Sequence, residues 1–335
     1  MTTQYSLGTA TRSFAHFDKP RGVTMVELMV ALAISSILML GVGTVYVTSK
    51  HSYKLQDELA KLQEDARFVY HTMTTDLRMA GYVGCSKLAE DQLVPQVLAI
   101  NPPGDIATIE ATRAADEALG QEMWVNHYIT GHSDSGGGTF SPGLYTAIAD
   151  TRPDTDAVTV FRGSECSASL SNRMADETSP INVFNNCGFT QGDVLMVSDC
   201  ARVDIFEVTN DPPNTGAVTL EHDASANLSA ALSAPYQQNA QVMRIVRNTY
   251  VIRDDPNDPD LTPTLFKMSF VNQAGALQPV TQPLVRNVED MRVLYGVDTN
   301  ADGSADTFQT ADQVGQPAGS RDTPDWGNVT ALKVS

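Results

Sequence analysis

The sequence is poor in positive charge. Its 335 residues include 22 lysines and arginines against 40 aspartates and glutamates, which gives a formal net charge of −18. Because an acidic surface repels phosphate groups, this excess argues against a nucleic-acid partner and favours a soluble outer face. The chain is long enough for one large or two modest domains, and 42% of its residues are hydrophobic, enough to fill a core.

Motifs of common enzyme classes are also missing. The sequence contains no Gly-rich phosphate loop and no metalloprotease helix. His132, Ser133 and Asp134 are residues of catalytic type, but they are adjacent within a predicted flexible loop, residues 131–138. Members of a catalytic triad converge from separate elements, so this adjacency does not supply the geometry. We therefore predict that the protein is not an enzyme.

Cysteines are few and lack the C-x-x-C spacing of metal sites; they are Cys85, Cys166, Cys187 and Cys200. Outside the cytoplasm an even set of this kind predicts two disulfides. Three connectivities are open. Cys187 and Cys200 flank a strand-like segment, residues 193–198, and could pair only if the chain folded back sharply. We therefore favour Cys166–Cys187 together with Cys85–Cys200.

One long apolar run, residues 23–47, is interrupted only by Glu27 and small hydroxyl residues. As a helix it would be about 37 Å long, enough to cross a bilayer. Lys19 and Arg21 precede it, and positive charge holds that side of a membrane helix in the cytoplasm. We expect a single-pass membrane protein whose remaining chain lies outside the cytoplasm.

Two other interpretations of this run were weighed. A secretory signal peptide would be cleaved near the Ala-Leu-Ala at residues 31–33, but strong hydrophobicity continues beyond that point. A plain membrane anchor leaves Glu27 unexplained. A charge in hydrocarbon is costly and usually marks a functional site with a partner.

The stretch RGVTMVELMVALAISSILML, residues 21–40, resembles the N-terminus of type IV prepilins. In that family a basic leader ends on Gly, and the fifth residue of the apolar helix that follows is Glu. The resemblance implies that a prepilin peptidase cleaves between Gly22 and Val23 and methylates the new amine of Val23. The family usually has Phe at this position, so Val23 departs from the pattern and leaves the efficiency of processing open.

The same resemblance implies a role for Glu27 in assembly docking. Its carboxylate would pair with the positively charged amine of a neighbouring subunit. In a low-dielectric environment this attraction is strong and an unpaired charge is heavily penalised, so the pair would favour docking in one register.

A helical period continues beyond the apolar run. Apolar residues recur at gaps of three and four: Leu55, Leu59, Leu62, Ala66, Val69, Met73, Leu77 and Ala80. Gly81 follows as a C-terminal stop. We predict one helix over residues 23–80, whose apolar stripe is the spine on which the globular domain packs.

Strand periodicity replaces the helical pattern after Gly81. The predicted strands lie within residues 156–163, 192–199, 201–210, 216–223, 241–254, 264–271 and 289–298. With the helix they define an α+β protein whose β part is mainly antiparallel. The domain prediction is a leader over residues 1–22, a pilin helix over 23–80 with 23–47 in the membrane, and a β-rich domain over 81–335.

The stretch DTNADGSAD, residues 298–306, has the spacing of a calcium loop. The candidate ligands are Asp298, Asn300, Asp302, Ser304 and Asp306. Gly303 would permit the sharp turn, but Gln309 stands where an EF-hand has a bidentate Glu. The alternative is a plain Asp/Asn/Gly turn between two strands. Calcium is the one cofactor that the sequence suggests, and none is required.

Three segments in order are similar to the PilW minor pilins of type IV pilus systems: RMAGYVGC (78–85), GDVLMVSDCARVDIFEVTN (192–210) and VEDMRVLYGVDTNADGSAD (288–306). The resemblance implies a role in priming pilus assembly near the tip, in motility or attachment. The implied partners are other minor pilins, the major pilin, the prepilin peptidase, the inner-membrane assembly platform and the lipid bilayer.

The resemblance also implies an inner-membrane protein with a periplasmic β domain, which later enters the pilus at the cell surface. Similar proteins continue past a final VTALKVS-like strand, so we expect that this chain is truncated at its C-terminus. Two alternatives remain: a minor pseudopilin of type II secretion, and a calcium-dependent adhesin or binding module carried on the pilus.

Overall fold

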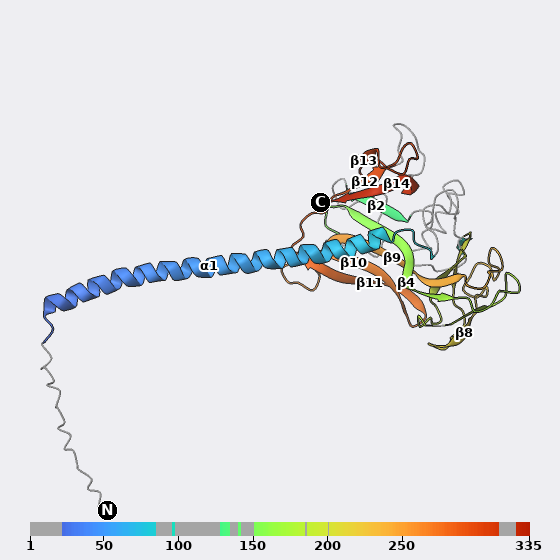
Figure 1. Cartoon of the computed structure of the whole chain (residues 1–335), viewed down its shortest axis with the longest axis horizontal. Helices are drawn as coiled ribbons and strands as arrows, with labels where there is room; N and C mark the ends of the chain where they lie inside the picture. The colour runs from blue at the N-terminus through green and yellow to red at the C-terminus, as the bar shows by residue number, and fades with distance from the viewer. Residues whose placement is uncertain are drawn as a thin grey trace, which may run out of the picture. The chain divides into compact units, whose positions relative to one another are not determined.

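The computed structural model describes residues 22–84, 96–97, 128–134, 140–141, 151–184, 186–199, 201–314 and 326–335. The chain divides into two compact units that meet between Glu64 and Asp65. Helix α1, Met25–Arg78, therefore contributes its last turns to the second unit, which also holds the β-sheets (Figure 1).

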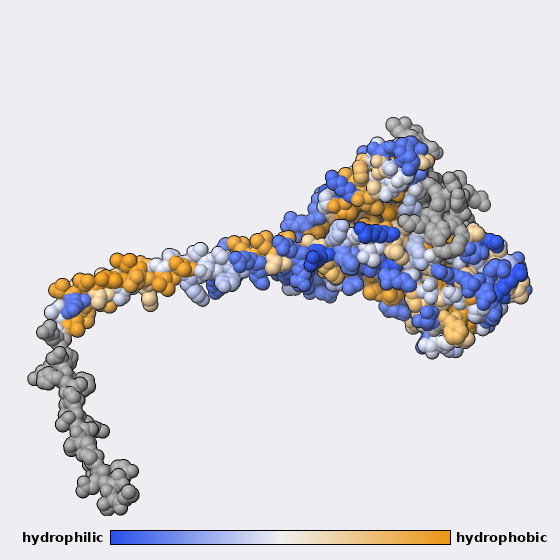
Figure 2. Space-filling view, viewed as in Figure 1, coloured by the Kyte–Doolittle hydropathy of each residue, from blue (hydrophilic) through white to orange (hydrophobic). Residues whose placement is uncertain are grey.

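The N-terminus of α1 is capped by Thr24. Its hydroxyl accepts a hydrogen bond from the amide of Glu27 at 3.3 Å, and its carbonyl accepts the amide of Leu28 at 3.1 Å. Thr-x-x-Glu at this point is the sequence of a capping box. Hydrophobic side chains cover the N-terminal half of the helix in Figure 2. Among the described helices, α1 is the one long and apolar enough to cross a membrane.

The apolar stripe of α1 packs on the β-sheets near its end. Met73 and Ala80 are buried, and Val69 and Leu77 pack against the same core cluster. In contrast, the stripe residues Leu55, Leu59 and Leu62 are 46%, 57% and 63% exposed. The prediction that the stripe is a spine for the globular domain is therefore confirmed for the last turns of the helix.

The strands form three sheets. Their bounds are β1 Gln96–Val97, β2 Ile129–Asp134, β3 Phe140–Ser141, β4 Ala157–Ser169, β5 Ile181–Phe184, β6 Val194–Ser198, β7 Val203–Glu207, β8 Ala217–Leu220, β9 Gln241–Asp254, β10 Pro263–Gln273, β11 Ala276–Arg286, β12 Val293–Val297, β13 Thr307–Gln309 and β14 Val329–Val334. A 3-10 turn, Trp326–Asn328, precedes β14. Apart from the parallel pair β1–β7, the described strand pairs are antiparallel, as predicted.

The largest sheet has nine strands in the order β1-β7-β6-β9-β4-β2-β3, with β10 added to β9 and β11 added to β10. Within this sheet, strand β9 pairs with three other strands. One side of β9 pairs with β4, while the other side pairs first with β6, through residues 241–244, and then with β10, through residues 249–254. The smaller sheets are β13-β12-β14 and β5-β8.

A core cluster joins the end of α1 to two of the sheets. It contains Met73 of the helix, Tyr250 of β9 and Tyr295 of β12. The ring of Tyr295 meets Trp326 edge to face, with ring centroids 4.9 Å apart. Aromatic pairs of this geometry add to the stabilisation that burial provides.

All seven predicted strand segments contain strands, but β2 falls in a predicted loop, and the short strands β1, β3, β5 and β13 were not predicted. Residues 131–134 belong to β2, so the predicted flexible loop over 131–138 was wrong for this part; residues 135–138 lie outside the described part of the chain. Strand β11 was not predicted. Its sequence carries Pro279 and Pro283, and proline normally argues against a strand.

Candidate assembly site

The predicted cleavage and docking residues lie at the start of α1. Gly22 and Val23 precede the helix, and Glu27 lies in its first turn. The side chain of Glu27 is exposed, and its neighbours Val26 and Leu28 are 71% and 54% exposed. The next acidic residue along the chain is Asp57.

The position of Glu27 in an apolar helix determines what kind of partner its charge requires. A negative charge in the first helical turn is favoured by the partial positive charge of the unpaired amides there. In a bilayer that effect does not replace the lost hydration, and a single carboxylate among apolar side chains requires a positive partner. Within residues 22–84, the basic residue nearest along the chain is Lys50, well beyond one helical turn, so α1 itself does not supply that partner.

A second polar site fixes the end of α1 to the large sheet. Asp76 is buried, and one of its carboxylate oxygens accepts hydrogen bonds from Arg162 of β4 at 2.8 and 3.1 Å. The other oxygen accepts hydrogen bonds from Asn248 and Tyr250 of β9, and the ammonium group of Lys267 on β10 lies 3.7 Å away. One helical residue is thus tied to three strands.

Asp76 stays ionised in this setting. Burial alone would raise its pKa, but the hydrogen bonds from Tyr250, Arg162 and Asn248 and the charge of Lys267 together lower the pKa below its ordinary value. Asp76 was not among the site residues predicted from the sequence. Asp76 is three positions after Met73 and four before Ala80, so an acid on the apolar face of the helix was the available signal.

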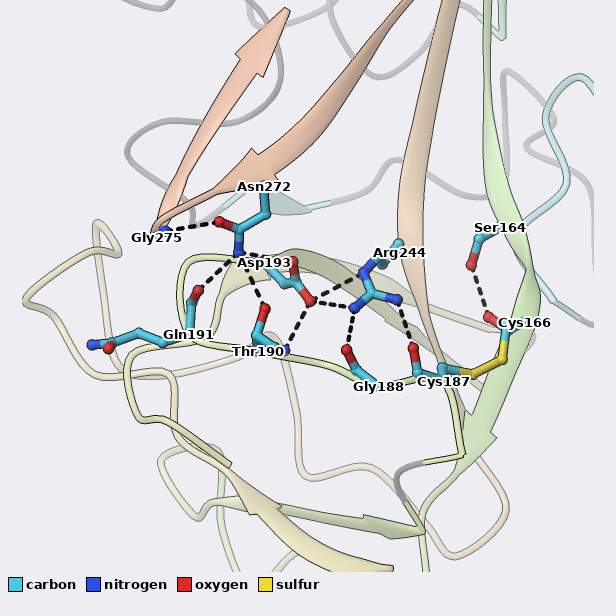
Figure 3. A network of polar contacts seen from close by, with 10 residues as sticks. All are labelled: Ser164, Cys166, Cys187, Gly188, Thr190, Gln191, Asp193, Arg244, Asn272 and Gly275. Carbon is cyan, nitrogen blue, oxygen red and sulfur yellow. Dashed lines mark hydrogen bonds and ion pairs between the residues drawn. A yellow bond between two sulfur atoms is a disulfide. The ribbon is translucent and has the colours of Figure 1, made fainter. Parts of the chain in front are cut away.

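A third polar network organises the loop before β6 (Figure 3). Arg244 of β9 donates to Asp193 at 2.7 and 3.0 Å and to the carbonyl of Cys187 at 2.8 Å. Asn272 at the end of β10 donates to the other oxygen of Asp193 at 2.9 Å and to the carbonyl of Gln191 at 2.8 Å. The network connects the loop with β9 and with the β10–β11 hairpin.

The groove beside this network has a volume of about 290 Å³. It is lined by Thr190, Asp193, Val194, Arg244, Ile245, Phe270, Val271 and Asn272. Its polar side chains bond to one another or to main-chain carbonyls, as described above, so they serve the packing of the domain.

The structure contains the disulfide Cys166–Cys187, one of the two pairings favoured from sequence. The Cα atoms are 5.7 Å apart, and 21 positions separate the residues in the sequence. The bridge joins β4 to the loop that Arg244 also holds. Cys85 and Cys200 lie outside the described residues.

The five candidate calcium ligands lie on the connection from β12 to β13. Asp298 accepts hydrogen bonds from the amides of the next residues, among them Ala301 at 2.7 Å and Gly303 at 2.6 Å. Burial opposes ionisation of Asp298, but these amides outweigh it and its pKa lies below the ordinary value. Asn300 donates to Asp306 at 3.2 Å, which brings two of the candidate ligands together.

The fold also separates the side chains of the three adjacent residues of catalytic type, His132, Ser133 and Asp134. His132 and Asp134 are buried on one face of β2, and alternation along the strand turns Ser133 to the other face. His132 contacts the hydroxyl of Thr159 at 3.0 Å, whereas Ser133 accepts the amide of Ala311. Across the described ranges, no three His, Cys, Asp or Glu side chains are grouped to hold a metal ion.

Two family models match the chain. The prokaryotic N-terminal methylation motif matches residues 18–43, and Type IV Pilus-assembly protein W matches residues 249–335. No curated protein and no solved structure matches. With the apolar run over residues 23–47, in which Glu27 is the one acid, the first match defines the class, a protein with an N-terminal methylation motif. The second match narrows it: over residues 249–335 the chain matches the type IV pilus-assembly protein W (PilW) family, which points to a role in pilus assembly.

Proposed function

We propose that the chain is a minor pilin that primes type IV pilus assembly near the tip. It is inserted in the inner membrane by α1, with the β domain in the periplasm, and a prepilin peptidase cleaves between Gly22 and Val23. The new amine is methylated. The subunit then joins other minor pilins, and the major pilin adds behind them. This is a structural role in docking and not a reaction with turnover.

Glu27 supports this proposal most directly. It is the one acid between Gly22 and Asp57, and it lies exposed in the first turn of an apolar helix. Because burial of the unpaired charge in lipid is costly, a subunit gains by placing Glu27 against a positive group of a neighbour. The amine that cleavage creates at Val23 of an adjacent subunit has the required charge and lies at the same depth of the membrane.

The experiment compares Glu27→Ala and Glu27→Gln with a control, Asp57→Asn, which removes a charge farther along the same helix. Processing is followed by the mass of the cellular protein, and incorporation by immunoblotting of sheared pili. We expect normal processing and reduced incorporation for both Glu27 variants, with no change for the control. Normal piliation in both Glu27 variants would contradict the docking role.

A minor pseudopilin of type II secretion would have the same N-terminal chemistry. The two functions are separated by a deletion of the gene. Loss of surface pili and twitching motility is expected for the pilus role, whereas loss of exoprotein secretion with intact pili would identify the secretion role.

A second candidate function is calcium-dependent binding through residues 298–306. The contact of Asn300 with Asp306, which brings two candidate ligands together, supports it. Titration of the full chain in detergent with calcium tests it by calorimetry, with Asp298→Asn/Asp306→Asn as control. Heat that the control lacks would support a site. Absence of heat at millimolar calcium would leave the stretch as a turn.

A further inference from the structure

Strand β11 forms a long outer edge of the large sheet. Among the described strands it pairs with β10 alone, and residues 278–283 are exposed. The two ends of the main strand order, β1 and β3, are two residues long, whereas β11 spans Ala276–Arg286. A long exposed edge offers unpaired main-chain groups to a strand of another molecule, and short edge strands do so much less.

The hairpin that carries this edge is held in place at its tip. From Ser269 onward β10 no longer pairs with β9, so the hairpin continues as a two-stranded ribbon. Asn272 binds the ribbon tip to the loop before β6, as described above. Gly192 in that loop has φ +79°, and a Cβ there would lie 2.3 Å from the carbonyl oxygen of Gly275. The tip and the loop thus meet backbone to backbone.

At both prolines of β11 the backbone nitrogen points away from β10, toward the open side of this edge. Pro279 lies opposite Phe270 and Pro283 opposite Phe266, within one unbroken stretch of register. In an antiparallel ladder, successive residues turn their N–H groups alternately toward and away from the partner strand. Because 279 and 283 differ by an even number, the two turn the same way. Proline has no N–H to donate. Because β11 pairs with β10 without a break across both prolines, their nitrogens point away from β10.

The outer row of donors is therefore interrupted twice. Positions 277, 279, 281 and 283 share the outward direction, and only Leu277 and Thr281 retain an N–H. A strand that added to this edge would lose two ladder hydrogen bonds and leave two of its own carbonyls unpaired, which is unfavourable where the carbonyl is buried.

We propose that Pro279 and Pro283 close the outer edge of the β10–β11 ribbon to strand addition from a second copy of this chain. Copies of a membrane-anchored subunit share one plane and one orientation, so identical edges meet often. The prolines keep these encounters from becoming edge-to-edge pairs and leave the chain available for its other contacts. This inference concerns only the β domain and does not depend on the docking role of Glu27.

The test uses the full chain in detergent micelles. Pro279→Thr/Pro283→Thr restores both donors with a residue that favours strands. Sedimentation velocity over a range of concentrations, compared with wild type, is expected to show a shift toward dimer and larger species. Amide exchange should slow at residues 277–283 as the variant is concentrated. An unchanged state of association over the whole range would overturn the proposal.

Two further variants test the geometry itself. Thr281→Pro removes one more outward N–H and is expected to leave the melting temperature unchanged. Gln282→Pro removes an N–H that faces β10 and is expected to lower it. Equal destabilisation by both would show that the outward assignment is wrong. Adding Thr281→Pro to the double variant should restore the wild-type state of association, which separates edge pairing from association through α1.

Discussion

Arg162 donates two hydrogen bonds to one carboxylate oxygen of Asp76, at 2.8 and 3.1 Å, although the residues are 86 positions apart in the sequence. Asp76 lies in the last turn of α1 and Arg162 in a central strand. Because both side chains are nearly excluded from solvent, each depends on the other for its charge to be tolerated. The contact therefore fixes the end of the helix on the sheet.

Asp76→Asn is expected to lower the free energy of unfolding by about 3–5 kcal/mol, because it leaves the Arg162 guanidinium buried without a counter-charge. Urea unfolding of the full chain in detergent measures this loss. Asp57→Asn, an exposed acid on the same helix, serves as the control and should change little. A loss of unfolding free energy no larger than that of the control would show that the buried pair does not hold the helix.

The pH dependence of stability should reveal Asp76 as well. Its folded-state pKa lies below the ordinary value of 3.8, so its contribution is present above that pH and disappears as the pH falls toward the folded pKa. Wild type should therefore lose more stability than Asp76→Asn when both are acidified below pH 3.8. Parallel curves in this range would contradict the assignment.

The pKa of Asp204 shifts in the opposite direction, upward. Burial raises its pKa, although hydrogen bonds from Ser233 and Tyr236 oppose the rise, and its second oxygen has no partner in the described residues. The folded state thus holds the proton more tightly, so stability falls as the pH rises from 3.8 through the folded pKa. Asp204→Asn should flatten this part of the stability curve. An unchanged slope would argue against a protonated Asp204.

The disulfide Cys166–Cys187 closes a loop of 21 positions. Its removal by Cys166→Ser/Cys187→Ser is expected to cost about 3 kcal/mol, chiefly because the unfolded chain becomes less constrained. Each single variant breaks the same bridge and should show nearly the same loss. A double variant as stable as wild type would mean that the hydrogen bonds of Arg244 hold the loop without the bridge.

The turn of the β10–β11 hairpin offers a stabilising substitution. Its two residues, Ala274 and Gly275, have φ +54° and φ +86°, the combination found in type I′ turns. Asn tolerates this region better than Ala, so Ala274→Asn should raise the free energy of unfolding by up to about 1 kcal/mol. Ala274→Val should lower it, since a branched side chain is poorly accommodated there. The opposite order of melting temperatures would contradict the turn assignment.

The sequence predicted those features that repeat along the chain. The helix and the seven strand segments follow periodic apolar patterns, and the methylation motif depends on local spacing. Asp76 could not be assigned in this way, because its partners come from β4, β9 and β10, and only the folded sheet brings them together. Strand β11 was missed because Pro279 and Pro283 are read as strand breakers, whereas a strand at the edge of a sheet tolerates proline when the missing N–H faces outward.

The stripe of α1 shows a further limit of periodicity. Leu55, Leu59 and Leu62 follow the same spacing as Met73 and Leu77, yet they are exposed, whereas Met73 and Leu77 pack within the β domain. A helical repeat states that one face is apolar but does not name what covers it. Likewise, the spacing of residues 298–306 suits both a calcium loop and a turn, and calcium binding there stays a prediction.

The proposed docking of Glu27 requires an amine that cleavage creates at Val23, and the mass of the mature N-terminus tests this requirement most directly. Intact and peptide mass spectrometry of the protein from membranes and from pili should show a chain that begins at Val23 and carries one added methyl group. A chain that still begins at Met1, in cells that process their other prepilins, would contradict it.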